Sequence, residues 1–105
     1  MSARVLVVED NRALAEDLAE LLREESMSVV VCHDAESAEA EVQREGFSVA
    51  LVDISLTGAS DGLDLVPKLH RIDPNGEVLL VTGNATLDTA MGAIRRGVYA
   101  YVTKP

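Results

Sequence analysis

Residues 48–55 read SVALVDIS, an apolar run that leads into a single aspartate, Asp53. A run this short, rich in β-branched valine and preceded by Gly46, is typical of a strand buried on both faces of a sheet. Such strands belong to parallel sheets, which bind ligands at the carboxyl ends of their strands. Asp53 would lie at such an end. Taken alone, the stretch is equally compatible with Asp53 as the cap of the following turn, because aspartate is common where turns begin.

Four further apolar runs predict strands over residues 4–8, 28–32, 77–82 and 98–103. The amphipathic stretches between the strands predict four helices. The first helix covers residues 12–25 after a cap at Asp10 or Asn11, and the second runs from Asp34 or Ser37 to Gly46. The third follows a cap at Asp64, which leaves Pro67 in the first turn, and it ends at Ile72. The fourth runs from Leu87 to Gly97. Five strands alternating with four helices predict an α/β fold whose mostly parallel sheet is covered on both faces.

Apolar residues at helical spacing indicate the side of each helix that faces the sheet. The expected inward sets are Leu14, Leu18, Leu21 and Leu22 in the first helix; Ala35, Ala38 and Val42 in the second; Leu65, Val66, Leu69 and Ile72 in the third; and Leu87, Ala90, Met91 and Ile94 in the fourth. Met91 is also expected to fill the core, as is Met27.

The chain has 105 residues, which is the size of one domain (residues 1–105), and a net charge of −9. Twelve acids and three bases between residues 9 and 45 account for the whole of that charge. An acidic surface repels phosphate backbones, so direct binding of nucleic acid is not expected. The sequence has no apolar run near the ~20 residues of a membrane span, so no membrane association is expected. The lone cysteine, Cys32, suits a reducing, cytoplasmic location.

Polar residues follow the apolar runs at the predicted carboxyl ends of four strands. They are Glu9 and Asp10, Asp53, Thr82, and Lys104. In a parallel sheet these ends share one edge, so three carboxylates, a hydroxyl and an ammonium group would converge. Three carboxylates repel one another unless a cation lies between them, and Mg²⁺ prefers oxygen ligands of this kind. Asp53 could then be the nucleophile of aspartyl-phosphate chemistry. The two histidines, His33 and His70, are expected to be surface residues away from this edge.

This ordered set resembles the receiver domain of a two-component response regulator, and the likeness extends over essentially the whole chain. The matching motifs are Glu9-Asp10, Asp53 after its strand, Thr82-Gly83 and Lys104-Pro105. The resemblance implies a doubly wound, flavodoxin-like sheet with strand order 2-1-3-4-5. It also implies that a final helix is absent from this chain, so the natural chain is expected to continue past Pro105. Apolar surface left by that helix would favour self-association.

The resemblance also implies a role for each site residue. Asp53 would accept a phosphoryl group from the phosphohistidine of a sensor histidine kinase or phosphotransfer protein. Mg²⁺ would be held by Asp10, by Asp53, by the backbone carbonyl of Ser55, and by Glu9 through a water molecule. Lys104 and Thr82 would contact the phosphoryl group. Thr82 and Tyr101 would form the switch that alters the surface of the fourth helix and fifth strand, where an output domain, a partner protein or a second copy would bind.

Two departures from the family pattern concern the loop after Asp53. Thr57 takes the place of a common proline, and the loop to Gly62 is one residue longer than usual. Both changes are expected to affect the switching behaviour more than the phosphorylation. One alternative is a binding module of the same fold that works without phosphorylation. A phosphohydrolase is a weaker alternative, because enzymes of that kind carry a second acid two residues after the nucleophile and this chain has Ser55 there. The domain is therefore not expected to be an enzyme.

Overall fold

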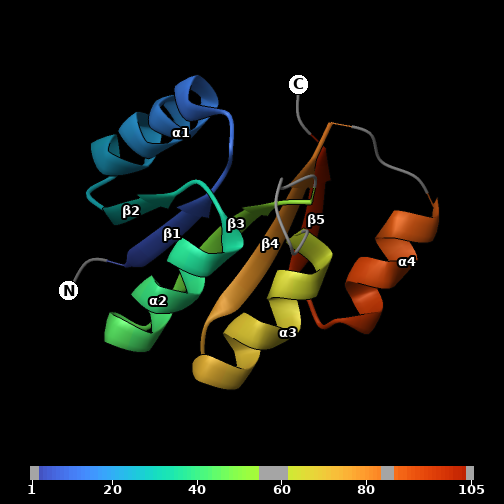
Figure 1. Ribbon diagram of the computed structural model, residues 1–105. Coiled ribbons are helices and arrows are strands. Elements are labelled where there is room, and N and C mark those ends of the chain that lie inside the picture. The colour runs from blue at the N-terminus through green and yellow to red at the C-terminus, as the bar shows by residue number, and fades with distance from the viewer. Residues whose placement is uncertain (1–2, 55–61, 84–86, 104–105) are drawn as a thin grey trace.

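The structure is a computed structural model, and it describes residues 3–54, 62–83 and 87–103. The strands are β1 (Arg4–Val8), β2 (Ser28–Cys32), β3 (Val49–Asp53), β4 (Glu77–Thr82) and β5 (Ala100–Thr103). The helices are α1 (Arg12–Glu24), α2 (Ala35–Glu45), α3 (Gly62–Ile72) and α4 (Leu87–Arg95). Strands and helices alternate along the chain, as the sequence predicts (Figure 1).

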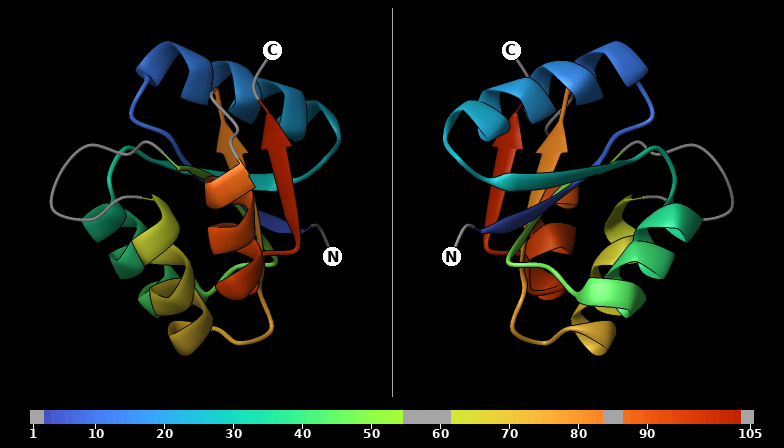
Figure 2. Two further views of the ribbon diagram at one scale, coloured as in Figure 1. Left: turned by 90° about the vertical axis from the view of Figure 1, so that its right-hand side faces the viewer. Right: turned by 90° about the vertical axis from the view of Figure 1, so that its left-hand side faces the viewer.

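The five strands form one sheet with the order β2-β1-β3-β4-β5. Every neighbouring pair is parallel, so the carboxyl ends of all five strands point toward the same edge. Figure 2 shows α1 on one side of the sheet and α2 and α3 on the other. The predicted fold class and strand order, a doubly wound flavodoxin-like sheet, are confirmed.

Alternate residues of each strand pack on opposite faces of the sheet. The larger core cluster joins the sheet to α2, α3 and α4 and includes Leu6, Val8, Ala50, Val52, Val78, Leu80, Ala38, Val42, Leu65, Val66, Leu69 and Ala93. The smaller cluster lies under α1 and contains Val5, Val7 and Ala15, with Leu18, Leu22 and Met27 packed against it. The central strands β1 and β3 therefore contribute to both layers, which fixes their ends firmly in place.

The predicted inward face of α1 is wrong at Leu21, which is 61% exposed. Ala15 and Ala19 are fully buried instead, and Leu18 and Leu22 pack beside them. These four residues form one stripe at helical spacing, and Leu21 lies to one side of it. Small side chains in the stripe let the helix approach the sheet closely. The alanines rather than the leucines thus set the rotation of this helix.

The predicted inward face of α4 is also wrong, at Met91 and Ile94. Ala93 is fully buried, whereas Met91 is 42% and Ile94 is 71% exposed. Ala93 packs in the larger core cluster and Ala90 is partly buried, whereas Met91 and Ile94 lie toward solvent. Met91 is therefore not core filler. The side chain of Leu87 lies outside the described part of the molecule.

Several predicted element boundaries differ from the structure, including the starts of α3 and β5 and the ends of α1 and α4. Helix α3 begins at Gly62, so Asp64 lies in its first turn rather than capping it, and Pro67 lies inside the helix. The early start follows from the buried contact of Gly62 with the end of β3, where the Gly62 N–H donates to the carbonyl of Ile54 at 3.2 Å. Strand β5 begins at Ala100 rather than at residue 98.

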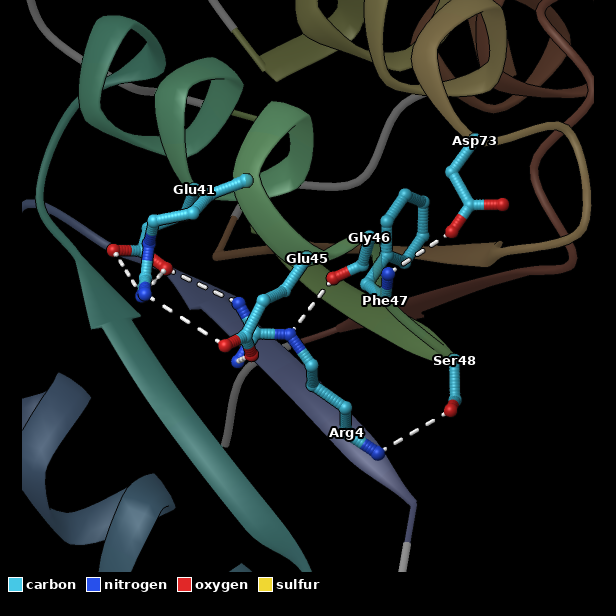
Figure 3. Close-up of polar contacts among 8 residues, drawn as sticks. Arg4, Glu41, Glu45, Gly46, Phe47, Ser48 and Asp73 are labelled. Carbon is cyan, nitrogen blue, oxygen red and sulfur yellow. Dashed lines mark hydrogen bonds and ion pairs between the residues drawn. The ribbon is translucent and has the colours of Figure 1, made fainter.

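The amino-terminal end of the sheet is held by side chains (Figure 3). Arg4 of β1 donates to the Gly46 carbonyl at 2.8 Å and forms ion pairs with Glu41 and Glu45, both at 3.1 Å. The Asp73 carboxylate accepts from the Phe47 N–H at 3.0 Å, which joins the end of α3 to the start of β3. We call these contacts the amino-end clamp.

Among the described helices, none has the length and apolar character needed to cross a bilayer.

Candidate functional site

Three carboxylates meet at the carboxyl edge of the sheet. Glu9, Asp10 and Asp53 each place an oxygen within 4.8 Å of the others. Glu9 and Asp53 follow the paired residues Val8 and Val52 on adjacent strands, so the register of the sheet brings them side by side. Glu9 is 3% exposed and Asp53 is 5% exposed, whereas Asp10 is only partly buried. The structure therefore brings together the three acids that the sequence singles out, and we call them the acidic cluster.

Backbone and capping contacts position Glu9. Its N–H donates to the Cys32 carbonyl at 3.0 Å, which extends the β1–β2 ladder by one step. Its carboxylate accepts from the N–H of Asn11 at 3.2 Å. Asn11 in turn caps α1, because its side-chain oxygen accepts from the Leu14 N–H at 3.1 Å. The start of α1 and the end of β1 thus hold Glu9 from both sides.

Asp53 is held by the contact between β3 and α3. It is the last residue of β3 and pairs with Val81 of β4, and the next residue, Ile54, donates to the Val81 carbonyl at 3.0 Å. A side-chain carbon at Gly62 would lie 2.2 Å from the Asp53 carbonyl oxygen. Only glycine lets α3 begin this close to the strand, because a contact below 3.0 Å cannot be tolerated. The aspartate therefore sits on a tightly fixed backbone.

Thr82 and Tyr101 lie on the two strands beyond β3. Thr82 is the last residue of β4, is 2% exposed, and pairs with Thr103 of β5. Tyr101 of β5 pairs with Leu80, is partly buried, and packs against the larger core cluster. Thr82 thus lies at the same sheet edge as the acidic cluster. Ser55 and Lys104, together with Thr57 and the rest of the loop to Gly62, fall outside the described residues.

Sequence reasoning missed His33. It was expected away from the strand-end edge, but it directly follows β2, and its Nδ1 lies 2.9 Å from the backbone carbonyl oxygen of Glu9. The rule that found the other site residues, the first polar residue after an apolar run, also selects His33, because the run before it ends at Cys32. His70 lies in the last turn of α3.

Two groups at the carboxyl end of β2, the Cys32 thiol and the Asp34 carboxyl, have shifted pKa values. Burial, assisted by the nearby charges of Glu41 and Asp34, raises the pKa of the Cys32 thiol to about 11. The thiol is therefore neutral near pH 7 and behaves as a small core group. Side-chain and backbone hydrogen bonds from Ser37 lower the pKa of Asp34, which caps α2.

The acidic cluster has the composition of a site for a hard divalent cation. Its three members offer carboxylate oxygens, and two of them are almost completely removed from solvent. Carboxylates so close together repel one another, and a cation removes that repulsion. Mg²⁺ is bound in proteins by one or two carboxylates and keeps several waters. The residues present fit such an ion.

The fold and the site together define a parallel α/β domain with an acidic cluster at the carboxyl ends of its central strands. The family model described as the response regulator receiver domain matches residues 5–105. The chain belongs to this family of two-component signalling domains.

Relatives and solved structures agree with this assignment. The response regulator protein FleR of Pseudomonas aeruginosa is 37% identical over 105 residues, which is 100% of this chain and 22% of FleR. A response regulator from Burkholderia pseudomallei, solved with a phosphorylated aspartic acid, calcium and citrate, has a TM-score of 0.93 and 32% identity over 99% of this chain and 61% of that one. A CheY-like receiver domain protein from Methanospirillum hungatei has a TM-score of 0.94 and 30% identity over 100% of this chain and 83% of that one. The chain thus spans less than a quarter of the length of FleR.

Proposed function

We propose that this domain is a phosphoacceptor switch in which Asp53 takes the phosphoryl group of a phosphohistidine on a sensor histidine kinase or phosphotransfer protein. The observation that carries the proposal is the burial of Asp53 at 5% exposure within the acidic cluster at the sheet edge. The similar protein from Burkholderia pseudomallei contains a phosphorylated aspartic acid, which supports the same chemistry here.

In the proposed transfer, a carboxylate oxygen of Asp53 attacks phosphorus. A P–O bond forms as the P–N bond to the donor imidazole breaks, and the electron pair of that bond goes to the imidazole nitrogen, which takes up a proton. The rigid end of β3 limits the motion of Asp53 and so favours an in-line approach. The histidine side chain of the donor must reach the sheet edge, where Asp10 is partly exposed.

The acidic cluster would hold Mg²⁺ during this transfer. Asp10 and Asp53 would bind it directly, the Ser55 carbonyl would be a third ligand, and Glu9 would act through a water molecule. The bound ion supplies positive charge next to the phosphoryl oxygens. Thr82 would donate a hydrogen bond to the transferred group, and Lys104 would pair with its remaining charge.

Phosphorylation would then alter the surface formed by α4 and β5. Thr82, buried at the end of β4, would shift toward the new phosphoryl oxygens, and Tyr101 on the adjacent strand would repack. An output domain, a partner protein or a second copy of the chain would bind the altered surface. The relatives that contain similar domains are longer, and one of them is named an alginate biosynthesis transcriptional regulatory protein.

The test is a mass measurement. The domain is incubated with a small acyl phosphate and Mg²⁺, and we expect a gain of one phosphoryl group that requires the metal. Asp53→Asn should abolish the gain. Asp17→Asn, which changes an exposed aspartate on α1, is the matched control and should be labelled like the wild type. A gain that persists in Asp53→Asn would refute the assignment. No gain in any variant would instead favour the phosphorylation-independent binding module.

A further inference from the structure

We propose that His33 is a positioning residue for the acidic cluster, and that its imidazole fixes the peptide between Glu9 and Asp10 in the orientation that Mg²⁺ binding requires. The inference rests on the proposed function, because it concerns the same cation site. Its physical basis is the 2.9 Å contact between His33 Nδ1 and the carbonyl oxygen of Glu9.

The contact replaces a missing step of the β1–β2 ladder. In a parallel pair, one residue donates its N–H to a partner on the neighbouring strand, and its carbonyl accepts from the residue two positions further along. The Glu9 N–H donates to the Cys32 carbonyl, so the Glu9 carbonyl would ordinarily accept from the N–H of Asp34. The chain instead turns at Asp34 to begin α2. The His33 side chain supplies the hydrogen bond that the backbone no longer makes.

A fixed carbonyl at Glu9 also constrains Asp10. The peptide group is planar and trans, so the orientation of the Glu9 carbonyl determines where the Asp10 N–H points and where the Asp10 α-carbon lies. Asn11 is already held as the cap of α1. Asp10 therefore lies between two residues whose backbones are held, Glu9 through its carbonyl and Asn11 through its role as the cap. Without His33, the Glu9–Asp10 peptide would lose one of its restraints, and the Asp10 carboxylate would be held less firmly next to Asp53.

The contact also fixes the tautomer of the imidazole. A carbonyl oxygen only accepts hydrogen bonds, so His33 Nδ1 must carry a proton. This leaves Nε2, on the far side of the ring, as the nitrogen without a proton when the ring is neutral. Free histidine favours the opposite tautomer, with the proton on Nε2, so the proposal makes a distinctive spectroscopic prediction.

The first experiment records long-range ¹⁵N–¹H spectra of the imidazole rings in the metal-free wild-type domain, with His70 as the internal reference. We expect the neutral ring of His33 to show the Nδ1–H pattern. An Nε2–H pattern would overturn the inference, whatever the domain does with Mg²⁺. This measurement needs no substitution and so does not depend on whether a variant folds.

The second experiment measures Mg²⁺ affinity from the backbone amide shifts of Asp10 and Asp53. His33→Leu keeps the bulk of the side chain but removes the donor, and we expect its Mg²⁺ dissociation constant to rise about tenfold. His33→Asn places an amide N–H near the position of Nδ1, and we expect an affinity close to that of the wild type. Recovery in the neutral Asn variant would assign the effect to the hydrogen bond rather than to charge. His70→Leu is the control for loss of a histidine elsewhere.

The outcomes separate the inference from the function on which it rests. If the wild type does not bind Mg²⁺, both are wrong. If the wild type binds Mg²⁺ and His33→Leu binds it equally well, only the positioning role is wrong. Equal weakening in the Leu and Asn variants would also overturn it, because the donor would then be irrelevant. Thermal unfolding of each variant in a chelator verifies that the fold is retained.

Discussion

Gly62 in α3 and Gly92 in α4 have very different surroundings, although both helices pack on the same face of the sheet. A side-chain carbon at Gly62 would lie 2.2 Å from the Asp53 carbonyl oxygen and 2.7 Å from the Ile54 α-carbon, and both of these are backbone atoms. We expect Gly62→Ala to push α3 away from β3 and to lower the free energy of unfolding by about 1–3 kcal/mol. Urea denaturation measures this loss, and the rate of acyl-phosphate labelling should fall with it.

Gly92→Ala is the matched control. The nearest atom to its added carbon would be the Arg96 guanidinium at 3.3 Å, at the end of a flexible side chain that can move aside. Alanine is the better helix former, so Gly92→Ala should raise the free energy of unfolding by about 0.5–1 kcal/mol. A Gly62→Ala variant as stable as the wild type would show that the close approach of α3 to Asp53 is not required.

At the scale of single elements, the start of α2 links stability to pH. Hydrogen bonds from Ser37 lower the pKa of the Asp34 carboxyl in the folded domain. A carboxyl whose folded pKa lies below its unfolded pKa stabilises the fold above the unfolded pKa, and this contribution disappears as the pH falls through the folded pKa. Asp34→Asn keeps a capping oxygen but carries no charge. We therefore expect the wild type to be the more stable of the two at about pH 7, and we expect this advantage to diminish as the pH falls from neutral through the lowered pKa of Asp34.

The measurement is the difference in melting temperature between wild type and Asp34→Asn over that pH range. Other carboxyls titrate in both proteins, and their effects cancel in the difference. Ser37→Ala removes the hydroxyl that bonds to Asp34, so in that background the pH dependence of the difference should be smaller. A constant difference from neutral to acidic pH would contradict the assignment of the shift to these hydrogen bonds.

Elements were also the scale at which sequence reasoning was most successful. Apolar runs predicted all five strands, and the pattern was clearest for β1, β3 and β4, whose residues are largely buried. The rotation of α1 and α4 was not predictable from the same pattern, because Ala19 and Ala93 face the sheet by virtue of their small size, and hydrophobicity favours Leu21 and Ile94 instead. The start of α3 depended on a backbone contact that no periodicity encodes.

The acidic cluster was predictable because the carboxyl ends of neighbouring parallel strands lie at one edge of the sheet. The pairing of Val8 with Val52 therefore brings the residues that follow them, Glu9 and Asp53, side by side. His33 was not recognised, since a histidine after a strand carries no signal of its own until the neighbouring carbonyl of Glu9 is located. Its role depends on where α2 turns away from β2, and that turn is a tertiary feature.

For the molecule as a whole, large apolar side chains are exposed on α4, on β5 and on the connection between them. On α4, Ile94 is 71% and Met91 is 42% exposed. Tyr99, between α4 and β5, is 72% exposed, and Val102 on β5 is 44% exposed. We expect concentration-dependent self-association through this surface, measurable by sedimentation velocity. Because each copy carries a net charge of −9, added salt should strengthen the association by screening repulsion.

Ile94→Glu should weaken this association, because it places a charge within the apolar surface. Leu21→Glu is the control, since Leu21 is 61% exposed on α1, away from α4 and β5. Equal effects of the two substitutions would indicate nonspecific attraction, and a wild type that sediments as a monomer at every concentration would contradict the prediction outright.

The amino-end clamp gives the molecule a gradient of local stability. At that end, Arg4 and Asp73 tie β1, α2, β3 and α3 together through charged and backbone groups. At the opposite end, the three carboxylates of the acidic cluster lie close together, and like charges at this spacing repel one another. Brief opening motions of the cation-free domain should therefore begin at the carboxyl edge, with the amino edge remaining closed as a fixed frame. Such a polarised domain could rearrange the edge at which we propose that Asp53 is phosphorylated, without unfolding the end that preserves its shape.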